Sequence, residues 1–224
     1  MVQDEVGIFN LALNAIGKRD QLSSTSERDR GAEVCRLWYP VIRDQVLSSA
    51  PWPSCKMFKR LAVLARKQPG DWTEADPEPG YAIAYSCPAD MLHPRYLTNF
   101  ASFSLSSYQG GVKALNTNVE QATLCYTFRN YAVTRWESEL QMAVAYGLAA
   151  NIVMPLTGKA QRANWLVEQA NDLILSARVE AANEGSERFE SIPDWLMARG
   201  YNNPGDNRYY YPFGTLLSNP GTSK

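Results

Sequence analysis

The sequence predicts a mainly helical protein, a bundle of about four main helices with a small antiparallel β insertion and an extended C-terminal arm. Before residue 80 and after residue 128, apolar residues recur at helical spacing. The stretch over 80–128 has few charged residues, and its apolar residues alternate with others as in strands. The final stretch has no helical period and is rich in proline, glycine and aromatic residues. We therefore expect a helical core over 1–185, a β-rich insertion at about 80–128 and an arm over 186–224.

Two helices are expected before residue 50. The first covers about 4–16 and ends at Gly17, because glycine is the residue most often found just after a helix. The second has an apolar face and an opposite charged face, which we interpret as exposed to solvent. Pro40 falls inside this second segment and predicts a kink or break near Tyr39. The apolar face consists of Val34, Leu37, Trp38, Val41, Ile42 and Val46.

The charge changes sign abruptly after this second helix. The basic block comprises Lys56, Lys59, Arg60, Arg66 and Lys67, and the acidic block that follows comprises Asp71, Glu74, Asp76 and Glu78. The basic block is a candidate for phosphate contact. Alternatively, the two blocks pair with each other or with a neighbouring subunit. These nine residues are therefore our candidates for a subunit interface or a DNA channel.

The second half of the core predicts two more helices. From Leu140 to Val153 the sequence is apolar almost all round and rich in small residues, which indicates a central helix packed closely on several neighbours. Pro155 is expected to end it, and a last long helix is expected over about 159–184. The apolar run over 142–156 contains Asn151 and Pro155, so we do not expect it to span a membrane.

The C-terminal arm is aromatic, which is unusual for a disordered tail. We expect it to dock on a partner, since aromatic and arginine side chains commonly anchor protein interfaces. The alternative is that it folds back on its own domain. The candidate partner-binding residues are Trp195, Arg199, Tyr209, Tyr210, Tyr211 and Phe213.

Composition and motifs exclude several function classes. A net charge of −1 argues against a globally basic nucleic-acid-binding protein. The single histidine, His93, lies beside a proline without a catalytic context, and the four cysteines form no C-x-x-C pair and are expected to be reduced. We therefore expect no catalytic, cofactor-binding or metal-ligating residue. Carboxylate pairs leave glycan hydrolysis open, at Glu74, Asp76 and Glu78 or at Glu137 and Glu139.

The order of several short segments is more specific than any single motif. They are Leu13-Asn14-Ala15-Ile16-Gly17, Cys35, Tyr39-Pro40, Arg43-Asp44, Leu47, Pro51-Trp52-Pro53, Lys59-Arg60-Leu61-Ala62, Tyr81-Ala82-Ile83-Ala84-Tyr85, Pro88-Ala89-Asp90-Met91-Leu92 and Pro155-Leu156-Thr157-Gly158. Together they resemble the head-to-tail adaptor family of short-tailed bacteriophages, also called tail tubular protein A or tail accessory factor. The resemblance covers about residues 5–185 and adds the segment 193–199 in the arm.

This resemblance implies a structural virion protein. Members form a ring, usually a dodecamer, between the portal protein and the tail nozzle protein. The ring extends the channel for double-stranded DNA and helps to retain the packaged genome. The implied location is the neck of the virion, after assembly in the cytoplasm of the host bacterium, and no cofactor is implied. Two other classes stay open: a peptidoglycan hydrolase that acts at cell entry, and a cellular DNA-associated regulator that uses residues 56–67.

Overall fold

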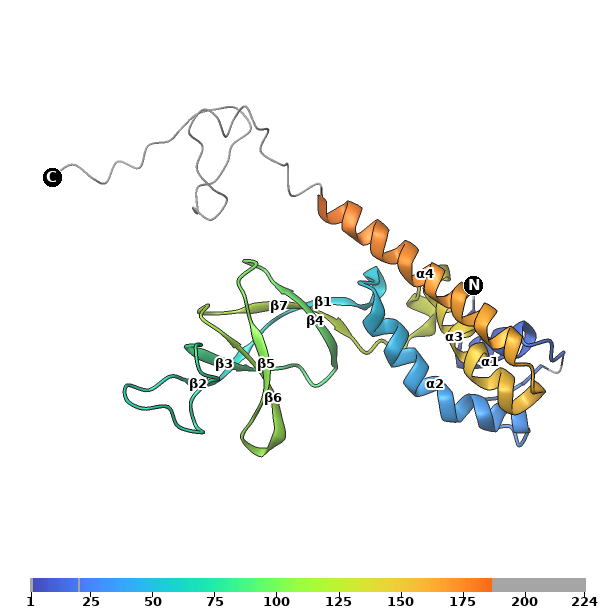
Figure 1. The fold of residues 1–224 in the computed structure, drawn as a ribbon, viewed down its shortest axis with the longest axis horizontal. Coiled ribbons are helices and arrows are strands. Elements are labelled where there is room, and N and C mark those ends of the chain that lie inside the picture. The colour runs from blue at the N-terminus through green and yellow to red at the C-terminus, as the bar shows by residue number, and fades with distance from the viewer. Residues whose placement is uncertain (1, 20, 187–224) are drawn as a thin grey trace, which may run out of the picture. The chain divides into compact units, whose positions relative to one another are not determined.

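The computed structural model describes residues 2–19 and 21–186. Within them the chain forms four α-helices and seven β-strands, and the strands belong to two antiparallel sheets (Figure 1). The expectation of a mainly helical protein with one small β insertion is therefore wrong, because the fold is mixed α/β. The expected arm over 186–224 lies outside the described residues except for Ser186.

The helices share one hydrophobic core. Their bounds are α1 (Glu5–Ala15), α2 (Arg30–Ser49), α3 (Ser138–Thr157) and α4 (Ala160–Ser186). Helix α2 continues through Pro40 without the expected break. Helix α3 runs past Pro155 and ends at Gly158, whose left-handed φ of 71° lets its N–H bond to the carbonyl of Met154.

Helix α3 is the central helix that the sequence predicts, and it packs against both α1 and α2. Its buried residues include small side chains, which allow neighbouring helices to approach closely. Within the described part of the chain, α3 alone is long and apolar enough to cross a membrane, and half of the qualifying stretch is buried. The core helix of a globular domain has the same composition. That the chain does not span a membrane stays a prediction.

The strands surround a second core formed by nine buried side chains. The three-stranded sheet has the order β1–β7–β4, with bounds Lys56–Arg60, Thr123–Phe128 and Met91–Leu97. The four-stranded sheet has the order β2–β3–β6–β5, with bounds Ala62–Arg66, Ile83–Ser86, Val112–Thr117 and Ser104–Tyr108. Short 3₁₀ turns occur at Pro53–Cys55, Gln109–Gly111 and Val133–Arg135.

The two strands that the sequence analysis missed, β1 and β2, precede the range 80–128. Both lie at the edge of their sheets, and nearly all of their residues are exposed on both faces. Alternation between apolar and polar residues arises when one face of a strand is buried, so these strands lack that signal. The only buried residue between 56 and 66 is Leu61, which joins the two strands.

The C-terminal end of α2 is the junction between the helices and the strands. Arg95 in β4 donates from Nη2 to the carbonyls of Ser48 (3.0 Å) and Ala50 (2.6 Å) and from Nε to Thr127 (2.8 Å). Arg178 in α4 donates to the carbonyl of Ser49 (2.7 Å). The last carbonyls of a helix have no partner within it, so these two arginines satisfy groups that would otherwise be orphaned.

Candidate functional site

The basic block forms the outer edge of the two sheets. Lys56, Lys59 and Arg60 lie in β1, Arg66 ends β2, and Lys67 follows it, all with exposed side chains. Charged side chains on an edge strand discourage pairing with other chains, which is one structural reason for this sequence. Arg66 contacts Glu120 at 3.2 Å, and no ion pair joins the basic block to the acidic block within the described residues.

The acidic block lies in the loop between β2 and β3, where its members have different environments. Asp71 and Glu74 are exposed. Asp76 is buried and accepts hydrogen bonds from the backbone of Gln68 (3.0 Å) and from the N–H and hydroxyl of Thr73 (both 2.8 Å). The bonds from the Gln68 and Thr73 backbones lower the pKa of Asp76. Asp76 therefore organises its own loop, and it is not a carboxylate that faces solvent.

The remaining acidic candidates also bond within the chain. Glu78 accepts a hydrogen bond from Asn116 at 3.2 Å. Glu137 is the residue before α3, and its carboxylate accepts from the N–H and the hydroxyl of Ser54, both at 2.7 Å. Glu78 and Glu137 therefore each take part in hydrogen bonds that connect separate parts of the chain. No cluster of three metal-ligating side chains occurs among residues 2–19 and 21–186.

One face of the three-stranded sheet carries a row of aromatic rings that crosses its strands. Phe58 in β1 and Tyr96 in β4 both pair with Cys125 of β7, so the three side chains lie in register. The Phe58 and Tyr96 rings meet edge to face with centroids 6.3 Å apart, and Phe100 stacks on Tyr96 at 5.2 Å. We call Phe58, Tyr96 and Phe100 the aromatic row, and the face that bears it the aromatic face.

The aromatic face is also positively charged. The Lys56 ammonium lies 5.8 Å from the centre of the Phe58 ring, and Arg60 follows two residues further along the same face of β1. The strands of this sheet contain Lys56, Lys59, Arg60 and Arg95 and no acidic residue. Burial lowers the pKa of Arg95, and the nearby charge of Arg178 adds to this effect. Burial is the main cause of the lowered pKa.

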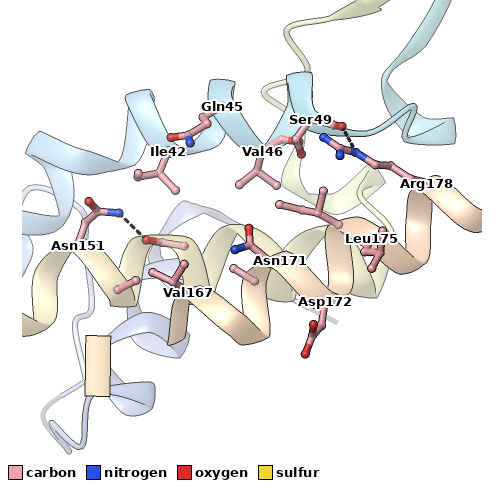
Figure 2. A pocket seen from close by; sticks show the side chains of 14 residues that line it. Ile42, Gln45, Val46, Ser49, Asn151, Val167, Asn171, Asp172, Leu175 and Arg178 are labelled. Atoms are coloured by element: carbon pink, nitrogen blue, oxygen red, sulfur yellow. Dashed lines mark hydrogen bonds between the residues drawn. The ribbon is translucent and has the colours of Figure 1, made fainter. Parts of the chain in front are cut away.

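A groove lies between α2 and α4, with α3 as its floor (Figure 2). Its volume is about 510 Å³, and its apolar side chains include Ile42, Val46, Val167 and Leu175. At the floor, a side chain on Gly147 would approach Ile42 to 3.0 Å, so glycine permits the close contact of α3 with α2. Polar groups line the rest of the groove, and Asn151 donates to the carbonyl of Gly147 at 2.8 Å.

Large apolar side chains are exposed along the same two helices. On α4 these are Trp165, Val167, Leu175 and Val179, of which Val167 and Leu175 line the groove. On α2 the exposed fractions of Leu37, Trp38 and Val41 are 71%, 37% and 60%. The apolar face expected for α2 is thus only partly buried. The core side of α2 is formed largely by Ala32, Cys35, Tyr39, Ile42, Val46 and Leu47.

Sequence reasoning missed both surfaces, because each combines segments that are distant in the chain. The only local signal was the two-residue spacing of Lys56, Phe58 and Arg60, which places them on one face if the segment is a strand. Six predicted partner-binding residues lie outside the described part of the chain: Trp195, Arg199, Tyr209, Tyr210, Tyr211 and Phe213. Their role stays a prediction.

A scan against protein-family models finds no match to this chain, and a search of curated proteins finds none either.

Proposed function

We propose that this protein is a ring-forming head-to-tail adaptor of a short-tailed bacteriophage, which joins the portal protein to the tail nozzle protein around the DNA channel. The proposal rests on the resemblance of the dispersed segments over about 5–185 and on one structural observation. That observation is the groove over α3, where the lining residues Val167 and Leu175 of α4 are large, apolar and exposed. Contiguous exposed apolar surface marks a site that a protein partner covers.

A second copy of the chain is the partner that this proposal requires. In a closed ring every subunit uses two different surfaces, one for each neighbour, and both are covered in the assembly. The groove would serve as one of these surfaces. The ring would be located in the neck of the virion and would form in the cytoplasm of the host.

The test is to image the purified protein by negative-stain electron microscopy, alone and mixed with portal rings from the same phage. We expect rings, or an added layer on the portal. The variant Val167→Asp/Leu175→Asp puts two charges on the groove and should prevent both. Leu105→Asp/Val112→Asp places the same two charges on exposed sites of β5 and β6 and serves as the matched control. Particles that stay small and ignore the portal would contradict the proposal.

The alternative function, peptidoglycan hydrolysis, has a separate test. Zymography on cell-wall gels detects it directly, and clearing that disappears in Glu139→Gln would favour the enzyme over the adaptor. Glu139 is chosen because it lies in the first turn of α3 and, unlike Glu137, has no side-chain bond to Ser54. No clearing is expected from an adaptor without a catalytic residue.

A further inference from the structure

Most edge strands of the two sheets carry features that discourage another strand from pairing with them. The edges are β1 and β4 in one sheet and β2 and β5 in the other. Strand β1 carries two lysines and an arginine, and β2 ends in Arg66 and has an irregular register after Val63. Strand β4 contains Pro94 and two register irregularities. Charge, proline and bulges are devices by which natural proteins protect sheet edges.

Strand β5 has none of these devices. Its five residues, Ser104–Tyr108, are uncharged and include no proline. Its register with β6 is regular over the whole strand. A flat and uncharged edge is the kind that accepts a further strand. Since the other three edges are protected, the exception at β5 indicates a place where a strand is added.

The backbone of β5 offers free hydrogen-bonding groups on its outer side. The N–H of Cys87 donates to the carbonyl of Lys113 at 3.1 Å, so the backbone of Lys113 in β6 faces β3. Backbone direction alternates along an antiparallel strand, so alternate residues of β6, beginning at Val112, bond to β5. Their partners are Ser104, Ser106 and Tyr108. The N–H and C=O groups of Leu105 and Ser107 therefore face outward, where the described residues provide no partner for them.

The side chain of Leu105 is the exposed end of an apolar row that crosses the four-stranded sheet. Leu105 pairs with Leu115 of β6, and Leu115 pairs with Tyr85 of β3. Leu115 and Tyr85 are fully buried in the core formed by the strands, whereas 41% of Leu105 is exposed. A strand added beside β5 would cover Leu105 and also bond to the outward backbone groups.

We propose that β5 pairs antiparallel with β5 of a second copy, across a two-fold axis that passes between the two Ser106 residues. In this register Leu105 of each copy lies opposite Ser107 of the other, and each such pair exchanges both of its N–H···O bonds. An isologous contact uses the same surface on both copies, so it requires no second unprotected edge. Strand β1 could not pair with itself in this way, because its lysines would meet like charges.

This contact goes beyond the proposed ring, which uses the groove over α3. Strand β2 is the alternative partner from a second copy, in a head-to-tail arrangement, but its irregular register after Val63 disfavours it. An extended segment of another protein is a further alternative. Experiments on the full chain distinguish these three occupants of the edge.

Cross-linking tests the register. The variant Ser106→Cys puts two thiols opposite each other at a Cα separation of about 4.5 Å, which is within the range for a disulfide. We expect mild oxidation to give a covalent dimer on non-reducing gels. Ser104→Cys is the matched control, because the proposed register places it opposite Tyr108 and not opposite itself. The wild type shows how much its own cysteines contribute.

Sedimentation velocity over a range of concentrations measures the strength of the pair. The groove variant Val167→Asp/Leu175→Asp is the suitable background, because it should form no rings and should still dimerise. Adding Ser107→Pro removes an outward N–H from each copy without breaking a bond to β6, and it should weaken dimerisation at least about tenfold. Adding Val63→Lys, which changes the edge of β2, should leave dimerisation unchanged.

Two variants separate this proposal from the proposed ring. The groove variant should lose the rings and keep the Ser106→Cys cross-link. Leu105→Asp/Val112→Asp should keep the rings and lose the pairing of β5, because it brings like charges together at this edge. Failure of ring assembly and failure of this proposal are therefore distinguishable. Thermal unfolding checks the fold of every variant, and Ser107→Lys replaces Ser107→Pro if the latter unfolds.

Three outcomes would overturn the proposal. The first is cross-linking of Ser104→Cys that equals that of Ser106→Cys, which would exclude the two-fold register. The second is loss of the dimer in Val63→Lys, which would indicate head-to-tail pairing of β5 with β2. The third is a chain that stays monomeric at every concentration and gives no Ser106→Cys cross-link, which would assign the edge to a different protein.

Discussion

Arg95 in β4 and Ala50 at the end of α2 are joined by a hydrogen bond of 2.6 Å from the guanidinium to the backbone carbonyl. The same guanidinium also bonds to the carbonyl of Ser48 and to the hydroxyl of Thr127. One side chain from the three-stranded sheet therefore holds the last turn of a helix from the other core. Pro51 follows immediately, so the helix cannot continue and its carbonyls depend on such partners.

Replacing this arginine tests the junction. Arg95→Met keeps much of the apolar stem but removes three hydrogen bonds, and we expect a loss of about 3 kcal/mol in the free energy of unfolding. Urea denaturation followed by circular dichroism measures it. Arg28→Met, at an exposed position, is the control and should change the free energy by less than about 0.5 kcal/mol. Equal stability of the two variants would show that the junction does not depend on Arg95.

The Tyr39 hydroxyl is buried and has no hydrogen-bond partner among the described residues. Burial also raises the pKa of Tyr39, so the group stays neutral at ordinary pH. We expect Tyr39→Phe to leave stability unchanged or to raise it by up to about 1 kcal/mol, because an unsatisfied polar group is removed. Tyr126→Phe is the comparison, since that hydroxyl lies 3.2 Å from the Asp90 carboxylate and its loss should destabilise. A clear loss in Tyr39→Phe would reveal a partner for this hydroxyl.

The loop between β2 and β3 should depend on the charge of Asp76. Because bonds from the Gln68 and Thr73 backbones lower its pKa in the folded chain, its contribution to stability is complete above about pH 4, the pKa of an unperturbed Asp. The contribution is lost as the pH falls through the lower, folded-state pKa. Limited proteolysis with pepsin across this acidic range should show cleavage within 67–82 increasing as the pH falls.

A charge-neutral substitution separates this effect from general acid unfolding. Asp76→Asn should be cleaved in the same loop at neutral pH, where trypsin or thermolysin is the suitable protease. Asp71→Asn, an exposed neighbour in the loop, should resemble the wild type. Resistance of Asp76→Asn at neutral pH would contradict the structural role assigned to this carboxylate.

The cysteines should differ in reactivity. Burial raises the pKa of Cys35 to about 12 and that of Cys55 to about 11, so very little thiolate forms at neutral pH. Cys87 is partly exposed, although burial raises its pKa as well. We expect iodoacetamide to modify Cys87 first and the buried thiols of Cys35, Cys55 and Cys125 only after unfolding, as read by mass spectrometry. Early labelling of Cys35 would show that the helical core opens readily.

The helices were predictable from the sequence because each has a strong local signal. The run from Leu140 to Val153 is apolar almost all round, and α4 ends within two residues of the expected position. The strands β1 and β2 were not predictable in the same way, since an edge strand exposed on both faces has no alternation. Because these two strands were missed, the sequence predicted a mainly helical fold and not a mixed α/β fold.

The candidate surfaces were harder to predict than the elements. The sequence did not distinguish Asp76 from the other three residues of the acidic block, and only the loop geometry shows that its oxygens accept hydrogen bonds from Gln68 and Thr73. The aromatic row depends on the register that places Phe58 and Tyr96 on either side of Cys125. Register across strands is set by long-range pairing, which the order of residues does not reveal.

Leu61 determines which side chains the two edge strands present. It is the single buried residue in a run of exposed ones, and its N–H donates to the carbonyl of Ala122 at 2.9 Å. Because successive side chains of a strand point to opposite faces, adding one residue before Leu61 would turn Phe58 toward the other face of its sheet. The number of residues from 56 to 61 is therefore constrained more tightly than the type of side chain at most of these positions. Homologous chains should show substitutions here before they show insertions or deletions.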